Sequence, residues 1–125
     1  MQNYRRLKVW EKAHALAVTV QGIADRIPRR NNTALIDQLR RSALSIPANI
    51  VEGAGCASDK EFARFLQIAL SSANEVEYHL QFAADVGVIP QAVYSKHQPE
   101  VIEIRKMLFA LIKRAKGEPR RQPAP

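Results

Sequence analysis

The chain has 125 residues, of which 46% are hydrophobic and 25% charged, and its formal net charge is +7. This length predicts one domain with one core and leaves no room for a separate catalytic module. The hydrophobic content excludes a disordered chain. The single cysteine, Cys56, excludes an internal disulfide and favours a reducing compartment.

The amino-terminal residues lack the pattern of a targeting signal. Residues 1–8 are mostly polar and lead directly into a helical pattern, without the apolar stretch of a secretory signal. No run approaches the roughly 18 apolar residues that a membrane-spanning helix requires. We therefore expect a cytoplasmic protein with no membrane partner.

Charge is distributed unevenly along the chain. Residues 1–53 carry nine Lys and Arg against four Asp and Glu, residues 54–86 carry two against five, and residues 87–125 carry eight against three. The acidic central stretch indicates ion pairing within the chain or between copies of it. The basic field on either side favours nucleic acid as a partner, although proteins that bind none also carry such fields.

The first predicted helix covers about 20 residues and shows apolar side chains at steps of three and four. Pro28 ends it, and the polar stretch 29–32 forms a turn. Its apolar positions are Val9, Trp10, Ala13, Leu16, Ala17, Val20, Ile23, Ala24 and Ile27.

The second predicted helix has the regular three-four spacing of a bundle seam. Pro47 lies inside this pattern, which continues on both sides of it, so we expect one helix kinked at Pro47 and not two. Residues 53–55, Gly-Ala-Gly, should end the helix by adopting left-handed backbone conformations. The apolar positions are Ile36, Leu39, Ala43, Ile46 and Ile50.

The third predicted helix is the longest, at about 28 residues or roughly 42 Å. Ser58 and Glu61 have the spacing of a capping box at its start, Gly87 ends it, and Pro90 opens the next helix. Its apolar positions are Phe62, Phe65, Leu66, Ala69, Ala73, Val76, Leu80, Ala83 and Val86.

The fourth predicted helix is clear only in its second half. Pro99 should break or bend its first turns, which leaves the helical state of residues 91–98 open. Residues 117–125 have the composition of a disordered, basic, proline-rich tail. The apolar positions are Val101, Ile104, Met107, Leu108, Leu111 and Ile112.

Four helices joined by short turns predict an all-α protein, an antiparallel up-down-up-down four-helix bundle. We assign this domain to residues 1–116. No stretch alternates with a period of two, so no sheet is expected.

The sequence offers no constellation typical of an enzyme. Glu11 and His14 have the Glu-x-x-His spacing of a di-iron bundle, but only once, and Glu75 and His79 are spaced four apart. Cys56 lies in a turn with no neighbour to activate it. We therefore predict no catalysis, no metal, no cofactor and no small-molecule substrate.

The second helix carries a polar strip beside its apolar seam. Four of its residues follow one another at steps of four, four and three and therefore share one helix face: Arg41, Ser45, Asn49 and Glu52. One interpretation is a polar network that fixes helix register or a subunit interface; the other is a phosphate-binding patch built on two arginines, which the nearby glutamate would oppose. The strip comprises Gln38, Arg40, Arg41, Ser45, Asn49 and Glu52.

Better phosphate candidates lie at the ends of the predicted helices. Aromatic residues are few and fall mostly on core stripes, so contacts to phosphate or to nucleic-acid shape are favoured over base stacking. The candidates form three groups: Arg5, Arg6 and Lys8; Arg26, Arg29 and Arg30; and Lys113, Arg114, Lys116, Arg120 and Arg121.

These residues are part of a longer pattern. Residues 7–10, Leu-Lys-Val-Trp, are followed by Gln-Leu-Arg-Arg-Ser-Ala at 38–43, Ser-Ile-Pro-Ala-Asn-Ile at 45–50 and Glu-Phe-Ala-Arg-Phe-Leu at 61–66. This pattern resembles the bacterial four-helix-bundle proteins encoded in 23S ribosomal RNA intervening sequences, over roughly residues 4–115. A related branch is the accessory variability determinant of diversity-generating retroelements.

The resemblance implies an antiparallel bundle that assembles as a ring-like homopentamer and has no known catalysis. The related accessory protein binds a reverse transcriptase and nucleic acid. The family pattern also groups Glu75 with the polar strip, a mixture of charges that favours packing and assembly over phosphate contact. Cys56, where the family often has a basic residue, and Pro99 depart from the pattern.

We therefore expect a homo-oligomer that binds nucleic acid, with structured RNA favoured, through its basic ends and tail. One alternative is an adaptor that docks a partner protein such as a reverse transcriptase. Another is a self-assembling element that has no ligand.

Overall fold

The computed structural model describes residues 2–117. Within them a short 3₁₀ helix precedes four long helices, and no strand is present, which confirms the prediction of an all-α protein with four helices. The elements are η1 (Tyr4–Arg6), α1 (Lys8–Asp25), α2 (Thr33–Ala54), α3 (Asp59–Asp85) and α4 (Gln91–Ala115).

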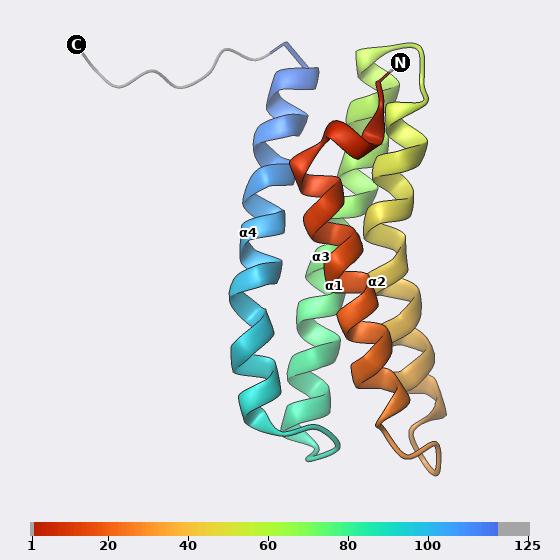
Figure 1. The fold of residues 1–125 in the computed structure, drawn as a ribbon, viewed down its shortest axis with the longest axis vertical. Coiled ribbons are helices and arrows are strands. Elements are labelled where there is room, and N and C mark those ends of the chain that lie inside the picture. The colour runs from red at the N-terminus through yellow and green to blue at the C-terminus, as the bar shows by residue number, and fades with distance from the viewer. Residues whose placement is uncertain (1, 118–125) are drawn as a thin grey trace, which may run out of the picture.

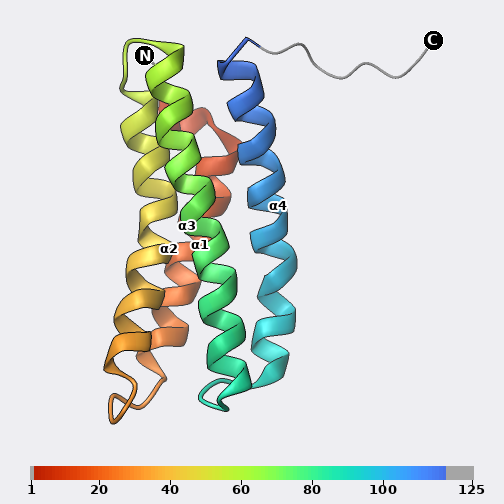
Figure 2. The same cartoon turned by 180° about the vertical axis from the view of Figure 1, so that it is seen from behind.

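The four helices lie lengthwise beside one another (Figure 1). The chain descends α1, returns along α2, descends α3 and returns along α4, so the start of α1 and the end of α4 lie at the same end. Helix α2 packs between α1 and α3, and α4 packs against α3 and more loosely against α1. The backbones of α1 and α3 do not approach each other closely, and the two helices lie on opposite sides of the bundle (Figures 1 and 2).

The core follows the predicted apolar stripes closely. All five positions of the α2 stripe are buried, because their three-four spacing keeps them on one face of the helix. Two positions of the α3 stripe differ: Val86 is 52% exposed at the C-cap, and Phe65 is half-buried. Phe65 lies at the edge of the core, where the Arg64 guanidinium covers its ring at 4.4 Å from the centroid.

The glycines at the end of α2 have a different role from the predicted left-handed helix ending. Gly55 is the C-cap, but its φ of −81° is right-handed, and Gly53 lies within the helix, so the left-handed ending is wrong. Gly53 instead allows close approach of α3. A Cβ atom there would lie 2.9 Å from Phe65 Cβ and 3.0 Å from Phe62 Cδ1.

The ends of α3 agree with the sequence in part. Ser58 caps the helix, since its Oγ accepts the Glu61 N–H at 3.1 Å, but the Glu61 carboxylate pairs with Arg64 at 3.1 Å and completes no capping box. At the other end Gly87, with φ of +79°, stops the helix as predicted. The Val88 N–H donates to the Ala83 carbonyl at 3.0 Å, as in a Schellman motif.

Both internal prolines lie in continuous helices. Helix α2 runs through Pro47 without interruption, which confirms one helix, while the kink there stays a prediction. Helix α4 is continuous from Gln91 to Ala115, so a break at Pro99 is wrong, while a bend there stays a prediction. The carbonyl that loses its donor belongs to Ser95, an exposed residue, so water can replace the missing hydrogen bond.

No helix in the described part of the chain is both long and apolar enough to cross a membrane. Most of the expected tail, residues 118–125, lies outside the described residues.

Candidate nucleic-acid interface and assembly surfaces

The predicted phosphate-binding residues are exposed. Within residues 2–117, none of the nine described candidates lies within ion-pair distance of a carboxylate. Arg120 and Arg121 lie outside the described residues. The nine are Arg5, Arg6, Lys8, Arg26, Arg29, Arg30, Lys113, Arg114 and Lys116.

Two of the three predicted groups meet at one end of the bundle. The start of α1 and the end of α4 enclose a hollow of about 330 Å³, with Arg6 and Lys8 on one side and Arg114 on the other. The turn η1 is fixed there, because the Gln2 N–H donates to the Ala54 carbonyl at 2.8 Å. The Tyr4 ring also packs edge-on against Trp10, with centroids 4.9 Å apart.

Two further cations at this end were missed by the sequence analysis. Lys60 and Arg64, at the start of α3, border a hollow of about 510 Å³ together with Glu61 and Lys116. They were overlooked because residues 54–86 are acidic on balance, with two Lys and Arg against five Asp and Glu. The up-down order of the helices was the available signal, because it places the first turn of α3 beside the last turn of α4.

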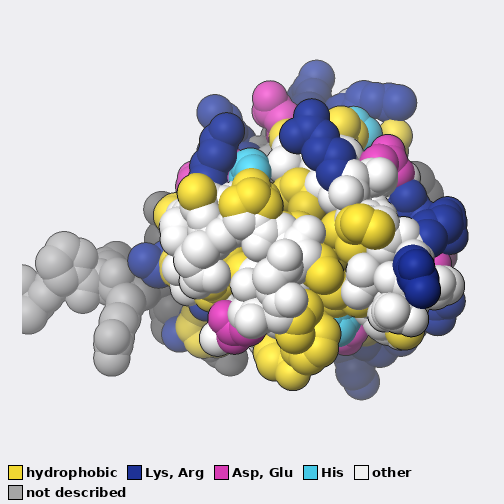
Figure 3. Space-filling view, turned by 90° about the horizontal axis from the view of Figure 1, so that it is seen from below, with side chains coloured by type: hydrophobic (Ala, Val, Ile, Leu, Met, Phe, Trp, Pro, Cys, Tyr) yellow, Lys and Arg dark blue, Asp and Glu magenta, His cyan; other side chains and the backbone are white. Residues whose placement is uncertain are grey.

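The remaining predicted group occupies the opposite end. Arg26 is the C-cap of α1, and Arg29 and Arg30 follow in the loop to α2, next to Asn31 with its φ of +67°. Figure 3 views this end directly and shows Lys and Arg side chains around much of the rim, with hydrophobic side chains between them. The 27 residues of α3 separate the two ends by about 40 Å.

The polar strip of α2 does not act as one network. Arg40 reaches across to α1, where its Nη2 lies 2.5 Å from Asp25 Oδ1. Gln21 donates to the same oxygen at 3.1 Å. Arg40 therefore bridges α1 and α2. Gln38 takes part only through its backbone, where its carbonyl accepts from Ser42 Oγ at 2.7 Å within α2.

A second polar contact joins α2 to α3. Asn49 Nδ2 donates to the Ser45 carbonyl at 2.8 Å and to Ser45 Oγ at 2.9 Å, and Ser72 Oγ of α3 lies 2.8 Å from Ser45 Oγ. Ser72 was not among the predicted network residues, because the spacing within one helix carries no information about its partner. The side chains of Arg41, Glu52 and Glu75 make no hydrogen bond or ion pair within residues 2–117 and are exposed.

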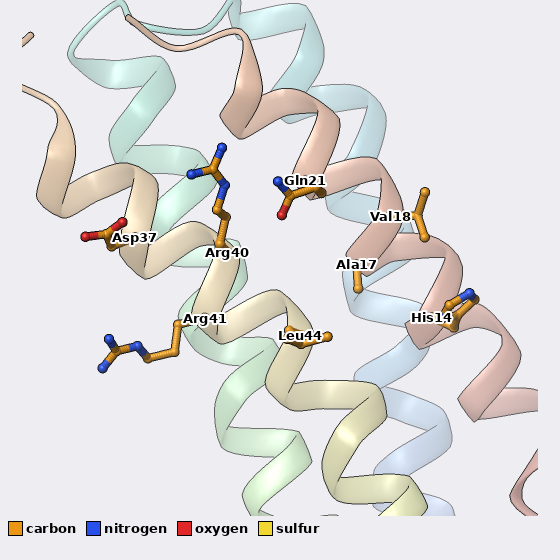
Figure 4. A pocket seen from close by; sticks show the side chains of 8 residues that line it. All are labelled: His14, Ala17, Val18, Gln21, Asp37, Arg40, Arg41 and Leu44. Carbon is orange, nitrogen blue, oxygen red and sulfur yellow. The ribbon is translucent and has the colours of Figure 1, made fainter. Parts of the chain in front are cut away.

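A groove of about 590 Å³ lies between α1 and α2 (Figure 4). Its apolar side chains are well exposed, Val18 at 60% and Leu44 at 64%. Leu44 points toward α1, whereas the Arg41 guanidinium extends away from α1 on the outer side of α2 (Figure 4). The groove therefore combines exposed apolar side chains with polar ones, among them the exposed carboxylate of Asp37 and the unpaired Arg41 at its edge.

Helix α3 presents a second exposed apolar face. Ile68, Tyr78, Phe82 and Val86 lie opposite its buried stripe, and Tyr78 is 61% exposed. Glu75 lies on the same face. No residue of α3 lines the groove, so this face and the groove are separate surfaces.

Two titratable groups have perturbed pKa values, and neither forms a reactive pair. Burial lowers the pKa of His79, against the opposing effect of Glu75, and its Nε2 atom is buried without a hydrogen-bond partner in the described chain. Burial, with Glu77 and Asp85 nearby, raises the pKa of Tyr94. No group of three or more potential metal ligands occurs within residues 2–117.

The fold and surface define a small all-helical protein, a four-helix protein with basic ends and two exposed apolar faces. The family model for the 23S rRNA-intervening sequence protein matches residues 5–110, so the chain belongs to this family. This confirms the resemblance found from the sequence.

A solved structure supports the same assignment. The chain is similar to a protein of unknown function from the S23 ribosomal protein family of Bacteroides thetaiotaomicron, with 31% sequence identity and a TM-score of 0.78. The similarity covers 84% of this chain and 95% of that one. Among curated proteins, none matches the chain.

Proposed function

We propose that this protein is a non-enzymatic homo-oligomer that binds nucleic acid, and structured RNA in particular, through its basic ends. One observation carries the proposal. The nine described cations of the three predicted groups are exposed and without an ion-pair partner within the described chain, whereas Arg40, Arg64 and Arg105 each pair with a carboxylate. Unpaired cations are free to replace the counterions of a phosphate backbone.

The arrangement supports contacts to phosphate more than contacts to bases. A base-stacking platform needs exposed aromatic faces beside the basic groups. At the start of α1 the rings of Tyr4, Trp10 and His14 pack on one another, and the exposed rings of Tyr78 and Phe82 lie on the apolar face of α3. Recognition through phosphates and helix shape is the usual mode for double-stranded RNA. We therefore expect binding with little sequence preference.

Self-association is supported by the two exposed apolar faces. The α1–α2 groove is concave, and the α3 face presents the projecting rings of Tyr78 and Phe82. A contact between such unlike faces is heterologous, and it forms a ring where the rotation closes. The proposed assembly is therefore a ring of antiparallel bundles, and the family resemblance favours five copies.

Charge supports the same pairing of faces. Arg41 at the edge of the groove and Glu75 on the α3 face are both exposed and without an ion-pair partner in the described chain. Opposite charges on two docking faces favour the correct partner and fix its register. A ring would also repeat each basic end, and this repetition adds avidity without new contacts.

Fluorescence anisotropy tests the nucleic-acid part. Nuclease-treated, salt-washed protein is titrated into labelled hairpin RNA and matched duplex DNA from about 50 to 300 mM salt. With six to ten phosphate contacts per assembly, affinity should fall by roughly 10³- to 10⁵-fold between about 50 and 200 mM. Binding seen only at the lowest salt would argue against the proposal.

The exposed apolar faces also favour a second candidate, an adaptor that docks a partner protein such as a reverse transcriptase. Exposed apolar patches commonly mark protein interfaces. A saturable complex with purified partner that survives nuclease treatment, together with weak RNA binding, would support the adaptor over the RNA-binding protein.

A further inference from the structure

We propose that the hollow between the start of α1 and the end of α4 is a binding site for a backbone phosphate of RNA, held by Arg6, Lys8 and Arg114. This inference rests on the proposed nucleic-acid binding and deepens it, because it selects one end of the molecule and three side chains. Neither the family match nor the similar structure assigns this site.

Three cations from distant parts of the sequence converge on the hollow. Arg6 and Lys8 lie more than 100 positions before Arg114, yet all three line one hollow of about 330 Å³. This volume is at the lower end of the roughly 300–1,000 Å³ typical of ligand pockets. No carboxylate lines the hollow, so the only charged side chains that an anion meets there are positive.

The lining of the hollow between these cations is apolar. It consists of Leu7, Val9, Met107, Ala110 and Leu111. Leu7 and Leu111 are half-buried against the core. Charges act more strongly beside apolar, poorly hydrated walls than in open water. The long stems of arginine and lysine also pack well on such walls while their charged ends stay free.

The elements that carry Arg6 and Arg114 are held in place before any ligand binds. The segment that carries Arg6 is tied to the bundle by the hydrogen bond from Gln2 to the Ala54 carbonyl and by the packing of Tyr4 on Trp10. Arg114 is held by the last turn of α4. Cations on fixed elements lose less conformational entropy on binding than cations on a free chain.

Position within the last turn of α4 does not by itself explain Arg114. A cation there complements the helix dipole, and Lys113 next to it would serve equally. Lys113, however, lies over the Phe109 ring at 4.8 Å from its centroid, outside the lining of the hollow. The two neighbours therefore differ in position, and this difference makes a sharp control possible.

The experiment compares two triple variants of the full chain with equal charge. Arg6→Gln, Lys8→Gln and Arg114→Gln neutralise the hollow, and Arg26→Gln, Arg29→Gln and Arg30→Gln neutralise the opposite end. Glutamine keeps much of each stem, and all six residues are exposed, so melting temperature and oligomer size should match the wild type. The probe is the same labelled hairpin RNA.

The hollow variant should bind about 10- to 100-fold more weakly near 150 mM salt and lose about one unit of salt slope. The matched variant should change affinity by roughly threefold or less. Single Arg114→Gln should weaken binding more than single Lys113→Gln. If the wild type binds RNA and both triples weaken it equally, the site is wrong while the proposed function stands.

A second measurement needs no variant. Hydrogen–deuterium exchange of the wild type with RNA should show protection at residues 107–114 and not at residues 26–33. Protection confined to residues 26–33 would overturn the site. If the wild type binds no RNA at all, the proposed function fails first and the inference fails with it.

Discussion

Gly53 lies at a close approach of α2 to α3, where a missing side chain lets the two helices pack together. Alanine normally favours a helix over glycine by about 1 kcal/mol. At position 53 the added Cβ would lie 2.9 Å from Phe65 Cβ, an atom close to the backbone that moves only with α3.

Gly53→Ala should therefore lower the free energy of unfolding by about 1–2 kcal/mol, because overpacking outweighs the helix preference. Gly22→Ala is the matched control, since nothing lies within 4 Å of its new Cβ, and it should raise stability by about 0.5–1 kcal/mol. Urea denaturation measures both. Equal stabilisation by the two substitutions would show that α2 and α3 are not in close contact.

His79 predicts a pH dependence whose sign follows from its lowered pKa. Burial disfavours the charged ring, so between the lowered pKa of the folded state and the ordinary histidine pKa of 6.5 the unfolded chain binds more protons. Stability should therefore fall as pH drops below about 6.5 and level off below the folded pKa. His79→Gln should flatten this part of the profile, and identical thermal-melt profiles for variant and wild type would contradict the prediction.

The role of a side chain could be predicted from the sequence where that role depends on a single helix. The buried positions of α2 followed from spacing alone. The partners of Arg40 and Ser45 did not, because Asp25 and Ser72 lie on other helices and no pattern within α2 encodes the distance to them.

At the element scale, α3 and α4 are joined by a polar contact centred on Glu77. Arg105 pairs with one carboxylate oxygen and Gln98 donates to the other at 3.3 Å. Arg105 also donates to Asn74 at 3.2 Å. The Glu77 side chain is only 19% exposed, so its hydrogen bonds face little competition from water.

Glu77→Gln should cost about 1–3 kcal/mol, since it leaves Arg105 without its charged partner. Glu103→Gln is the control: its contact with Lys12 across α1 and α4, 3.1 Å long, is more than half exposed on the glutamate side. It should cost less than about 1 kcal/mol. Equal costs in guanidinium denaturation would refute the central role of Glu77.

Helix ends were harder to predict than helix interiors. The Gly87 stop is local and was foreseen, whereas the continuity of α4 through Pro99 depends on solvent reaching the Ser95 carbonyl. The glycines at the end of α2 were assigned a backbone role, but Gly53 serves packing against a helix that starts several residues later. Local signals did not contain that neighbour.

For the whole molecule, the apolar faces predict how copies associate. Leu44→Glu in the groove and Phe82→Glu on the α3 face should each reduce the oligomer, because each places a charge in the proposed contact. Phe109→Glu on α4 is the control, as this residue is 54% exposed and belongs to neither face. Light scattering at several concentrations measures the mass, and an unchanged mass for the first two variants would rule out this pairing of faces.

The candidate site was predictable in its composition and not in its layout. Charge counting found the cations, but only the fold shows that Arg6 and Arg114 share a hollow while Arg29 lies at the far end. It also shows that Lys60 and Arg64 join the first of these ends. Proximity between distant segments follows from helix order, which spacing within each helix does not specify.

Sedimentation velocity tests whether an assembly of several chains binds structured RNA. Labelled hairpin RNA is mixed with nuclease-treated protein near physiological salt, about 150 mM, and the RNA label alone is followed. The RNA is expected to sediment with a particle of several protein chains, and higher salt should return it to the free position. RNA that stays at the free position while the protein sediments as an oligomer, or as a monomer, would contradict this expectation.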